Sequence, residues 1–153
     1  MNYTGKTILS CYYSIDKVIV QIENLIKKKA KNSFYDSSST ERQAEKILQL
    51  VEIRNDLFEL KVICETAFSK LSEVDNILIS YKYFGIKPQD ENFDLKSRNY
   101  FRKQIKALDN FNKILVKGGH DAEWFKAKYL KIAFIAGIYQ KAVLEEGKKH
   151  VIE

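Results

Sequence analysis

The chain contains few of the residues that interrupt helices. Its 153 residues include one proline and six glycines. Sandwiches and barrels need frequent turn signals, so this scarcity argues against both architectures. Hydrophobic residues make up 45% and charged residues 30%, the balance of a globular protein with a real core. The composition therefore predicts an all-α fold.

Long apolar runs are also missing. The longest, "IAFIAGIY" at 132–139, has eight residues, whereas a membrane-spanning helix needs roughly 20. The N-terminal stretch "MNYTGKTILSCYYSIDK" reaches polar and charged residues too soon to form the apolar region of a secretory signal. We therefore expect a soluble, cytoplasmic protein that does not enter a membrane.

The two cysteines and two histidines have no paired spacing of the kind that binds zinc. Cys11 and Cys64 fall on apolar helical stripes, so we expect small buried side chains in a reducing compartment. A disulfide between the first two helices is the alternative for this pair. Asp90, Glu91 and Asp94 are read as a solvated turn, with a metal-binding cluster as the less favoured alternative.

Motifs of the common enzyme classes are absent from the sequence. Gly118-Gly119 is not followed by the Gly-Lys-Ser/Thr of a phosphate-binding loop, and no G-x-S-x-G motif occurs. Neither histidine lies near a motif serine or cysteine that it could activate. We expect a protein that is not an enzyme and that uses no cofactor or metal.

Hydrophobic periodicity predicts a long N-terminal helical hairpin. Apolar residues recur at helical spacing within about 7–29 and again within about 39–69. The second stretch carries the alternating three-four spacing of a coiled-coil seam, at Leu50, Ile53, Leu57, Leu60, Cys64, Ala67 and Leu71. Packing between the two helices of the hairpin would account for this seam. The alternative is that the seam joins two copies of the chain in a homodimer. We assign residues 1–71 to this hairpin, as a dimerisation or partner-contact region.

Capping signals define a third helix after residue 72. "SEVD" at 72–75 has the form of a capping box, with Asp75 in the position usually taken by Glu. Gly85 is a natural C-cap, and Pro88 prevents the helix from continuing. A short helical turn is expected around residues 89–94.

Two further helical regions follow. A fourth helix is expected to start at Asp94 or Ser97 and to end before Gly118. The last region starts at Asp121, as two helices that meet near Lys131. We assign the third and fourth helices to one region at 72–117, and residues 118–153 to a C-terminal helical cap.

The net charge of +6 comes from one segment. Residues 1–76 contain eleven basic and eleven acidic side chains, whereas residues 77–153 contain fifteen and nine. The stretch "LKSRNYFRKQIKALDNFNKILVK" at 95–117 holds seven basic side chains and one acid. Such a local excess of positive charge is typical of a protein with a polyanionic partner.

The fourth helix separates its basic and apolar residues. At about 100° per residue, with Arg98 at zero, the basic side chains fall between roughly 0° and 140°. The apolar side chains fall between roughly 180° and 340° and are expected to pack on the body of the protein: Tyr100, Phe101, Ile105, Ala107, Leu108, Phe111, Ile114 and Leu115. The basic face is explained by nucleic-acid contact, by ordinary solvation or by an acidic protein partner, and we favour the first.

Several residues of this helix are candidates for contact with double-stranded DNA. Residues in its first turns, with Arg98, Asn99 and Arg102 among them, would reach base edges in the major groove. Lys103, Lys106 and Lys113 would contact phosphates and set the position of the helix. The predicted interface comprises Lys96, Ser97, Arg98, Asn99, Arg102, Lys103, Lys106 and Lys113.

The same region resembles a known family. "ILISYKYFG", followed after a short loop by "SRNYFRKQIKAL", is similar to the C-terminal helix-turn-helix of sigma factors. It is most similar to the ArpU-like, phage-type regulators of Gram-positive bacteria. The matching residues are Ser97, Tyr100, Phe101, Arg102, Lys106, Ala107 and Leu108. One departure is that "QDENFDLK" stands where the family has the first helix of the motif.

The resemblance implies a small DNA-binding transcription regulator of phage or mobile-element type. The basic helix would enter the major groove, and the hairpin would mediate homodimerisation or contact RNA polymerase. The alternative is a non-enzymatic protein-interaction adaptor, in which a degenerate helix-turn-helix binds an acidic protein partner.

Overall fold

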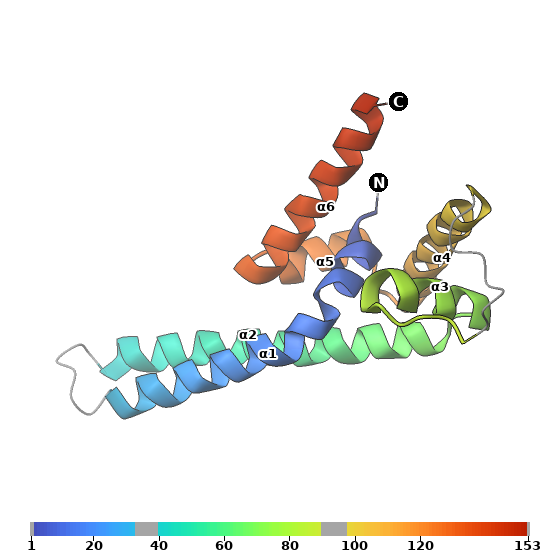
Figure 1. Cartoon of the computed structure of the whole chain (residues 1–153). Helices are drawn as coiled ribbons and strands as arrows, with labels where there is room; N and C mark the ends of the chain where they lie inside the picture. The colour runs from blue at the N-terminus through green and yellow to red at the C-terminus, as the bar shows by residue number, and fades with distance from the viewer. Residues whose placement is uncertain (1, 33–39, 90–97, 153) are drawn as a thin grey trace. The chain divides into compact units, whose positions relative to one another are not determined.

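The computed structural model describes residues 2–32, 40–89 and 98–152, with side chains up to residue 147. All regular secondary structure in these ranges is helical, so the prediction of an all-α fold is confirmed. The helices are α1 (Thr4–Asn32), α2 (Thr40–Ser69), α3 (Glu73–Phe84), α4 (Arg98–Lys117), α5 (Ala122–Tyr129) and α6 (Ala133–Ile152) (Figure 1).

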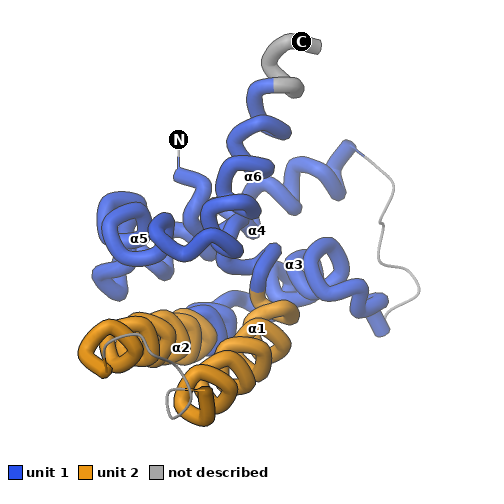
Figure 2. The backbone as a smooth tube through the Cα atoms, turned by 90° about the vertical axis from the view of Figure 1, so that its left-hand side faces the viewer, with its two compact units in different colours: residues 1–11, 63–153 blue, residues 12–62 orange. Residues whose placement is uncertain are grey.

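The chain divides into two compact units (Figure 2). One unit is formed by residues 12–62, and the other by residues 1–11 together with 63–153. Both α1 and α2 therefore contribute to each unit. The division into hairpin, helix-turn-helix and C-terminal cap at 1–71, 72–117 and 118–153 stays a prediction.

The unit formed by residues 12–62 is a two-helix hairpin, in which α1 and α2 run side by side in both views. Its buried apolar residues are Ile15, Ile19, Ile22, Leu57 and Leu60. The Lys61 ammonium lies 2.8 Å from the Asp16 carboxylate and connects the two helices at the surface. The expected seam is buried from Leu57 to Ala67 and only half-buried at Leu50, Ile53 and Leu71.

The other unit has a core to which all six helices contribute, with the buried Cys64 and Ala67 coming from α2. Its fully buried large side chains include Ile8, Leu9, Leu78, Ile79, Phe111, Leu115, Phe125, Tyr129 and Ile135. These side chains belong to α1, α3, α4, α5 and α6. The first two turns of α1 are therefore part of the core that supports α4.

α1 begins earlier than the sequence suggested. We expected its start at Thr7, but the helix begins at Thr4. The Asn2 side chain accepts a hydrogen bond from the Thr4 amide at 3.0 Å, as the side chain of an N-cap residue does. The Thr7 amide then donates to the Tyr3 carbonyl at 3.0 Å. The Asn2 side chain thus gives the Thr4 amide the hydrogen-bond partner that the first turn of a helix lacks, and this allows α1 to begin at Thr4.

The predicted boundaries of α3 agree with caps in the structure, whereas α1 ends at Asn32, about three residues later than expected. The Ser72 hydroxyl accepts from the Asp75 amide at 3.2 Å, and Gly85 ends α3 with a φ of 66°. The break between α5 and α6 falls around Lys131, as expected. The Asp75 carboxylate accepts from Asn110 instead of completing a capping box.

Part of the predicted structure lies outside the described residues. This applies to positions 90–94 of the expected helical turn and to a start of α4 at Asp94 or Ser97. The described part of α4 begins at Arg98.

Candidate nucleic-acid interface on α4

α4 is held against α3 by polar and aromatic contacts along its length. The Gln104 amide donates to the Leu78 carbonyl of α3 and, at 3.1 Å, to the Tyr100 hydroxyl. The Tyr100 ring meets the Tyr81 ring edge to face, with centroids 6.2 Å apart. Further along, the Asn110 amide donates to the Asp75 carboxylate at 2.8 Å. These contacts fix which face of α4 points away from the core.

The buried stripe of α4 is narrower than expected. It consists of Tyr100, Gln104, Ala107, Phe111 and Leu115. These positions span an arc of about 80° on a helical wheel. The expectation that Phe101 and Ile105 pack on the body was wrong, because their side chains are 62% and 70% exposed. Gln104 lies inside the stripe and is 4% exposed, a role that its polar side chain concealed in the sequence.

The predicted DNA-contacting residues within the described chain all lie on the open side of α4. They are Arg98, Asn99, Arg102, Lys103, Lys106 and Lys113, and each is exposed. Lys117 is exposed on the same helix. The remaining two candidates, Lys96 and Ser97, lie outside the described residues. The structure therefore brings six of the eight candidates together on one helix surface, and their contact with DNA stays a prediction.

The electrostatic balance of this face is strongly positive. α4 contains six basic residues and one acid, Asp109. The Asp109 carboxylate lies 3.1 Å from the Lys113 ammonium, one turn away, with both side chains exposed. An exposed pair of this kind contributes little to stability and neutralises only one of the six cations. The helix consequently presents a surface that can attract phosphates.

The cysteines have the environment expected from the sequence. Cys11 and Cys64 are free and buried. Burial raises the pKa of each thiol from 9.0 to about 12, and the nearness of Cys11 contributes to the shift at Cys64. Both thiols are therefore held in the protonated form that is a poor nucleophile and a poor metal ligand.

Potential metal ligands are scattered over the described parts of the chain. Within those parts, no three side chains of His, Cys, Asp or Glu come together as a metal site would require. The acidic residues Asp90, Glu91 and Asp94 lie outside them. His120 packs against the Trp124 ring, with ring centroids 4.5 Å apart. The position of His120 is therefore explained by packing against an aromatic ring.

None of the helices in the described ranges combines the length and the apolar character needed to cross a membrane. The chain matches no family model, no curated protein and no solved structure. The basic face of α4 is thus the feature on which a function has to be argued.

Proposed function

We propose that the protein is a small DNA-binding transcription regulator of phage or mobile-element type. The observation that carries the proposal is the exposed basic face of α4, which lies on the side opposite the buried stripe. Arg98, Arg102 and Lys106 form a like-charge row at i, i+4 and i+8, in which each neighbouring pair costs a few tenths of a kcal/mol. Phosphates would turn this repulsion into attraction.

The geometry of α4 suits a helix that enters the major groove. A helix of 20 residues is about 30 Å long, and its width fits a groove about 12 Å wide. In this proposal Arg98, Asn99 and Arg102, near the N-terminal end, read base edges. Lys103, Lys106 and Lys113 contact phosphates. The contacts of Gln104 and Asn110 with α3 support the proposal, because they fix the orientation of the basic face.

The hairpin would supply the second function of such a regulator. Several large apolar side chains of the unit formed by residues 12–62 are exposed, including Val20, Phe58 and Val62. Exposed apolar side chains of this kind are available to a second copy of the chain or to a protein such as RNA polymerase. We propose homodimerisation or polymerase contact as the role of the hairpin.

A second candidate function is a protein-interaction adaptor with an acidic partner. The exposed Phe101 and Ile105 side chains favour it, because they place apolar surface next to the basic face. Nucleic-acid binding by charge alone does not require this apolar surface. The adaptor would use the same helix without entering DNA.

Binding to random-sequence duplex DNA tests the proposal. The Arg98→Glu/Arg102→Glu variant should lose micromolar binding at low salt. The Lys126→Glu/Lys141→Glu variant introduces the same charge change at exposed positions of α5 and α6. It should retain most of the DNA binding of the unmodified protein. Equal losses in the two variants would show that net charge, and not the α4 face, controls binding. Absence of binding by the unmodified protein would leave the adaptor.

A further inference from the structure

α4 carries a second apolar seam beside its buried stripe. Its apolar positions are Phe101, Ile105, Leu108 and Val116, and the polar Asn112 lies between the last two, so that the spacing is four, three, four and four residues. This is the spacing at which one helix meets another along its length. Phe101 is 62%, Ile105 70% and Val116 48% exposed, while Leu108 and Asn112 are half-buried. The seam is therefore largely without cover in this protein.

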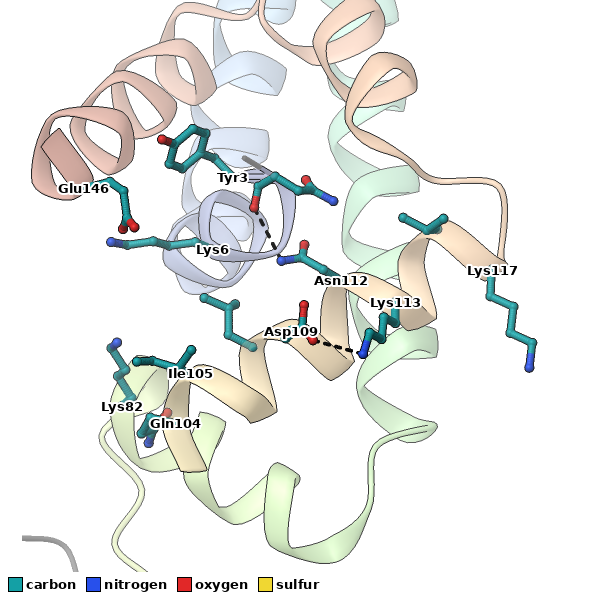
Figure 3. Close-up of a pocket in the computed structure, with 13 residues that line it drawn as sticks. Tyr3, Lys6, Lys82, Gln104, Ile105, Asp109, Asn112, Lys113, Lys117 and Glu146 are labelled. Carbon is teal, nitrogen blue, oxygen red and sulfur yellow. Dashed lines mark hydrogen bonds and ion pairs between the residues drawn. The ribbon is translucent and has the colours of Figure 1, made fainter. Parts of the chain in front are cut away.

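A groove of about 820 Å³ lies along this seam (Figure 3). Ile105, Leu108 and Val116 of α4 line it, together with residues from the start of α1, the end of α3 and the last turns of α6. In Figure 3, α4 runs along the groove from Gln104 to Lys117, with Lys82 near the first end. The groove follows a helix instead of enclosing a compact cavity.

The start of α1 forms one wall of the groove beside the C-terminal half of the seam. The Gly5 amide, in the first turn of α1, donates to the Asn112 side chain at 2.8 Å. A Cβ atom at Gly5 would lie 3.0 Å from the Phe111 ring, so the two helices meet at very close range. The first turn of α1 therefore contacts the seam at Asn112, while Phe101, Ile105 and Val116 are exposed.

The length of the seam points to an elongated occupant. Fifteen residues separate Phe101 from Val116, which corresponds to about 22 Å along the helix axis. A helix of about 15 residues covers that distance. A compact small molecule would leave one end of the seam in water.

The charge around the groove points to an acidic occupant. Four lysines line it, Lys6, Lys82, Lys113 and Lys117, against two carboxylates, Asp109 and Glu146. Lys6 is paired with Glu145 at 3.0 Å and Lys113 with Asp109 at 3.1 Å, so four lysines face three carboxylates and the lining has an excess of one positive charge. The basic face of α4 borders the seam directly, with Arg98 and Arg102 on the next positions around the helix. An acidic flank on the occupant would meet this positive rim.

We propose that the groove is the docking site for an acidic amphipathic helix of a partner protein. Leucine-like side chains of that helix would cover Ile105, Leu108 and Val116, in the helix-in-groove mode of recognition. Its glutamates or aspartates would face the positive rim, to which Arg98 and Arg102 contribute together with the groove lysines. The proposal does not rest on DNA binding, because Lys103 and Lys106 lie on the far side of the basic face.

A synthetic probe tests the docking site on the full-length protein. The probe is a fluorescein-labelled 18-residue helical peptide with leucines at heptad a and d positions and glutamates on both flanks. A second peptide carries lysines in place of the glutamates. The acidic peptide should bind at least about tenfold more tightly than the basic one, and the preference should shrink as salt screens the charges.

Two variants with equal charge changes locate the binding surface. Ile105→Glu places a carboxylate in the seam and should weaken the acidic peptide at least about tenfold, since apolar burial is lost and like charges meet. Val74→Glu changes an exposed valine of α3 that does not line the groove and should leave affinity within about twofold, as surface changes away from an interface do. Amide chemical shifts should change at Ile105, Leu108 and Val116 when the acidic peptide binds.

Three results would overturn the proposal. One is equal affinity for the acidic and basic peptides, and another is unchanged affinity in Ile105→Glu. The third is a change in the amide shifts of the groove with protein concentration alone, which would assign the groove to a second copy of this chain. Lys103→Glu/Lys106→Glu separates the two proposals, because it should weaken duplex DNA binding and leave peptide affinity within about threefold.

Discussion

At the scale of single residues, Gly5 has less room for a side chain than the other described glycines. A Cβ atom there would lie 2.6 Å from the Asn112 side-chain oxygen and 3.0 Å from the Phe111 ring. Replacing an exposed helical glycine by alanine normally stabilises a protein by about 0.5–1 kcal/mol. We expect Gly5→Ala to lower the free energy of unfolding by about 1–3 kcal/mol instead, because the added methyl overpacks the contact with α4.

Gly137 provides the matched control for this prediction. It lies in α6, and a Cβ atom built there meets nothing within 4 Å. Gly137→Ala should raise the free energy of unfolding in urea by about 0.5–1 kcal/mol. If Gly5→Ala stabilised the protein as much as Gly137→Ala does, the close approach of α1 to α4 would be wrong.

The sequence predicted the environment of the two cysteines but not that of Gly5. The burial of Cys11 and Cys64 followed from their places on apolar stripes, and the structure confirms it. The importance of Gly5 did not follow from the sequence, because a glycine has no side chain to mark the partner. Its contact with Asn112 joins positions 107 residues apart, so only the fold brings them together.

At the scale of helices, Gln104 decides how α4 is oriented on α3. Gln104→Ala removes two hydrogen bonds from a buried site and should lower the free energy of unfolding by about 1–3 kcal/mol. Its neighbour Lys103 is exposed, and Lys103→Ala should change the value by less than about 0.5 kcal/mol. Urea unfolding of both variants measures the difference. Equal stabilities would mean that Gln104 does not hold α4 in place.

The sequence predicted the helices better than it predicted their packing. Periodicity and caps located the hairpin, the end of α3 at Gly85 and the break near Lys131. Periodicity gives the direction of a buried face, but its width depends on how many neighbouring helices cover it. The wheel of α4 therefore placed Phe101 and Ile105 in the core, although the buried arc stops short of them.

The sequence predicted which basic residues form the candidate site, but it predicted only part of how that site is arranged in the fold. Like charges near one another on a helix are visible in the sequence, so the exposed basic face was expected. Gln104 was missed because a polar residue at one core position does not alter the helical period. The groove was missed because it needs the first turn of α1 beside α4, a contact between distant segments.

At the scale of the whole molecule, stability should fall at alkaline pH. Burial raises the pKa of Cys11 and Cys64 from 9.0 to about 12, and that of Tyr83 from 10.0 to about 12. The folded state therefore holds these protons more tightly than the unfolded chain does. Their contribution is fully present below about pH 9 and is lost as the pH rises towards 12.

Urea unfolding between pH 7 and 11 measures this loss. The free energy of unfolding should decrease by a few kcal/mol above about pH 9, with little change attributable to these groups below it. The Cys11→Ala/Cys64→Ala variant should start from a lower stability and decrease less steeply. A stability that stays constant to pH 11, or a slope unaffected by the double substitution, would contradict the buried positions of the thiols.

The most direct test of the central claim is the salt dependence of binding to random-sequence duplex DNA. If the α4 face contacts about five phosphates, the logarithm of the binding constant should fall with the logarithm of salt concentration at a slope near −4.5. The Arg98→Glu/Arg102→Glu variant should bind much more weakly, and any binding that remains at low salt should depend less steeply on salt. The Lys126→Glu/Lys141→Glu variant should keep the slope of the unmodified protein. A slope near zero, or no binding even at low salt, would contradict a DNA-binding role for α4.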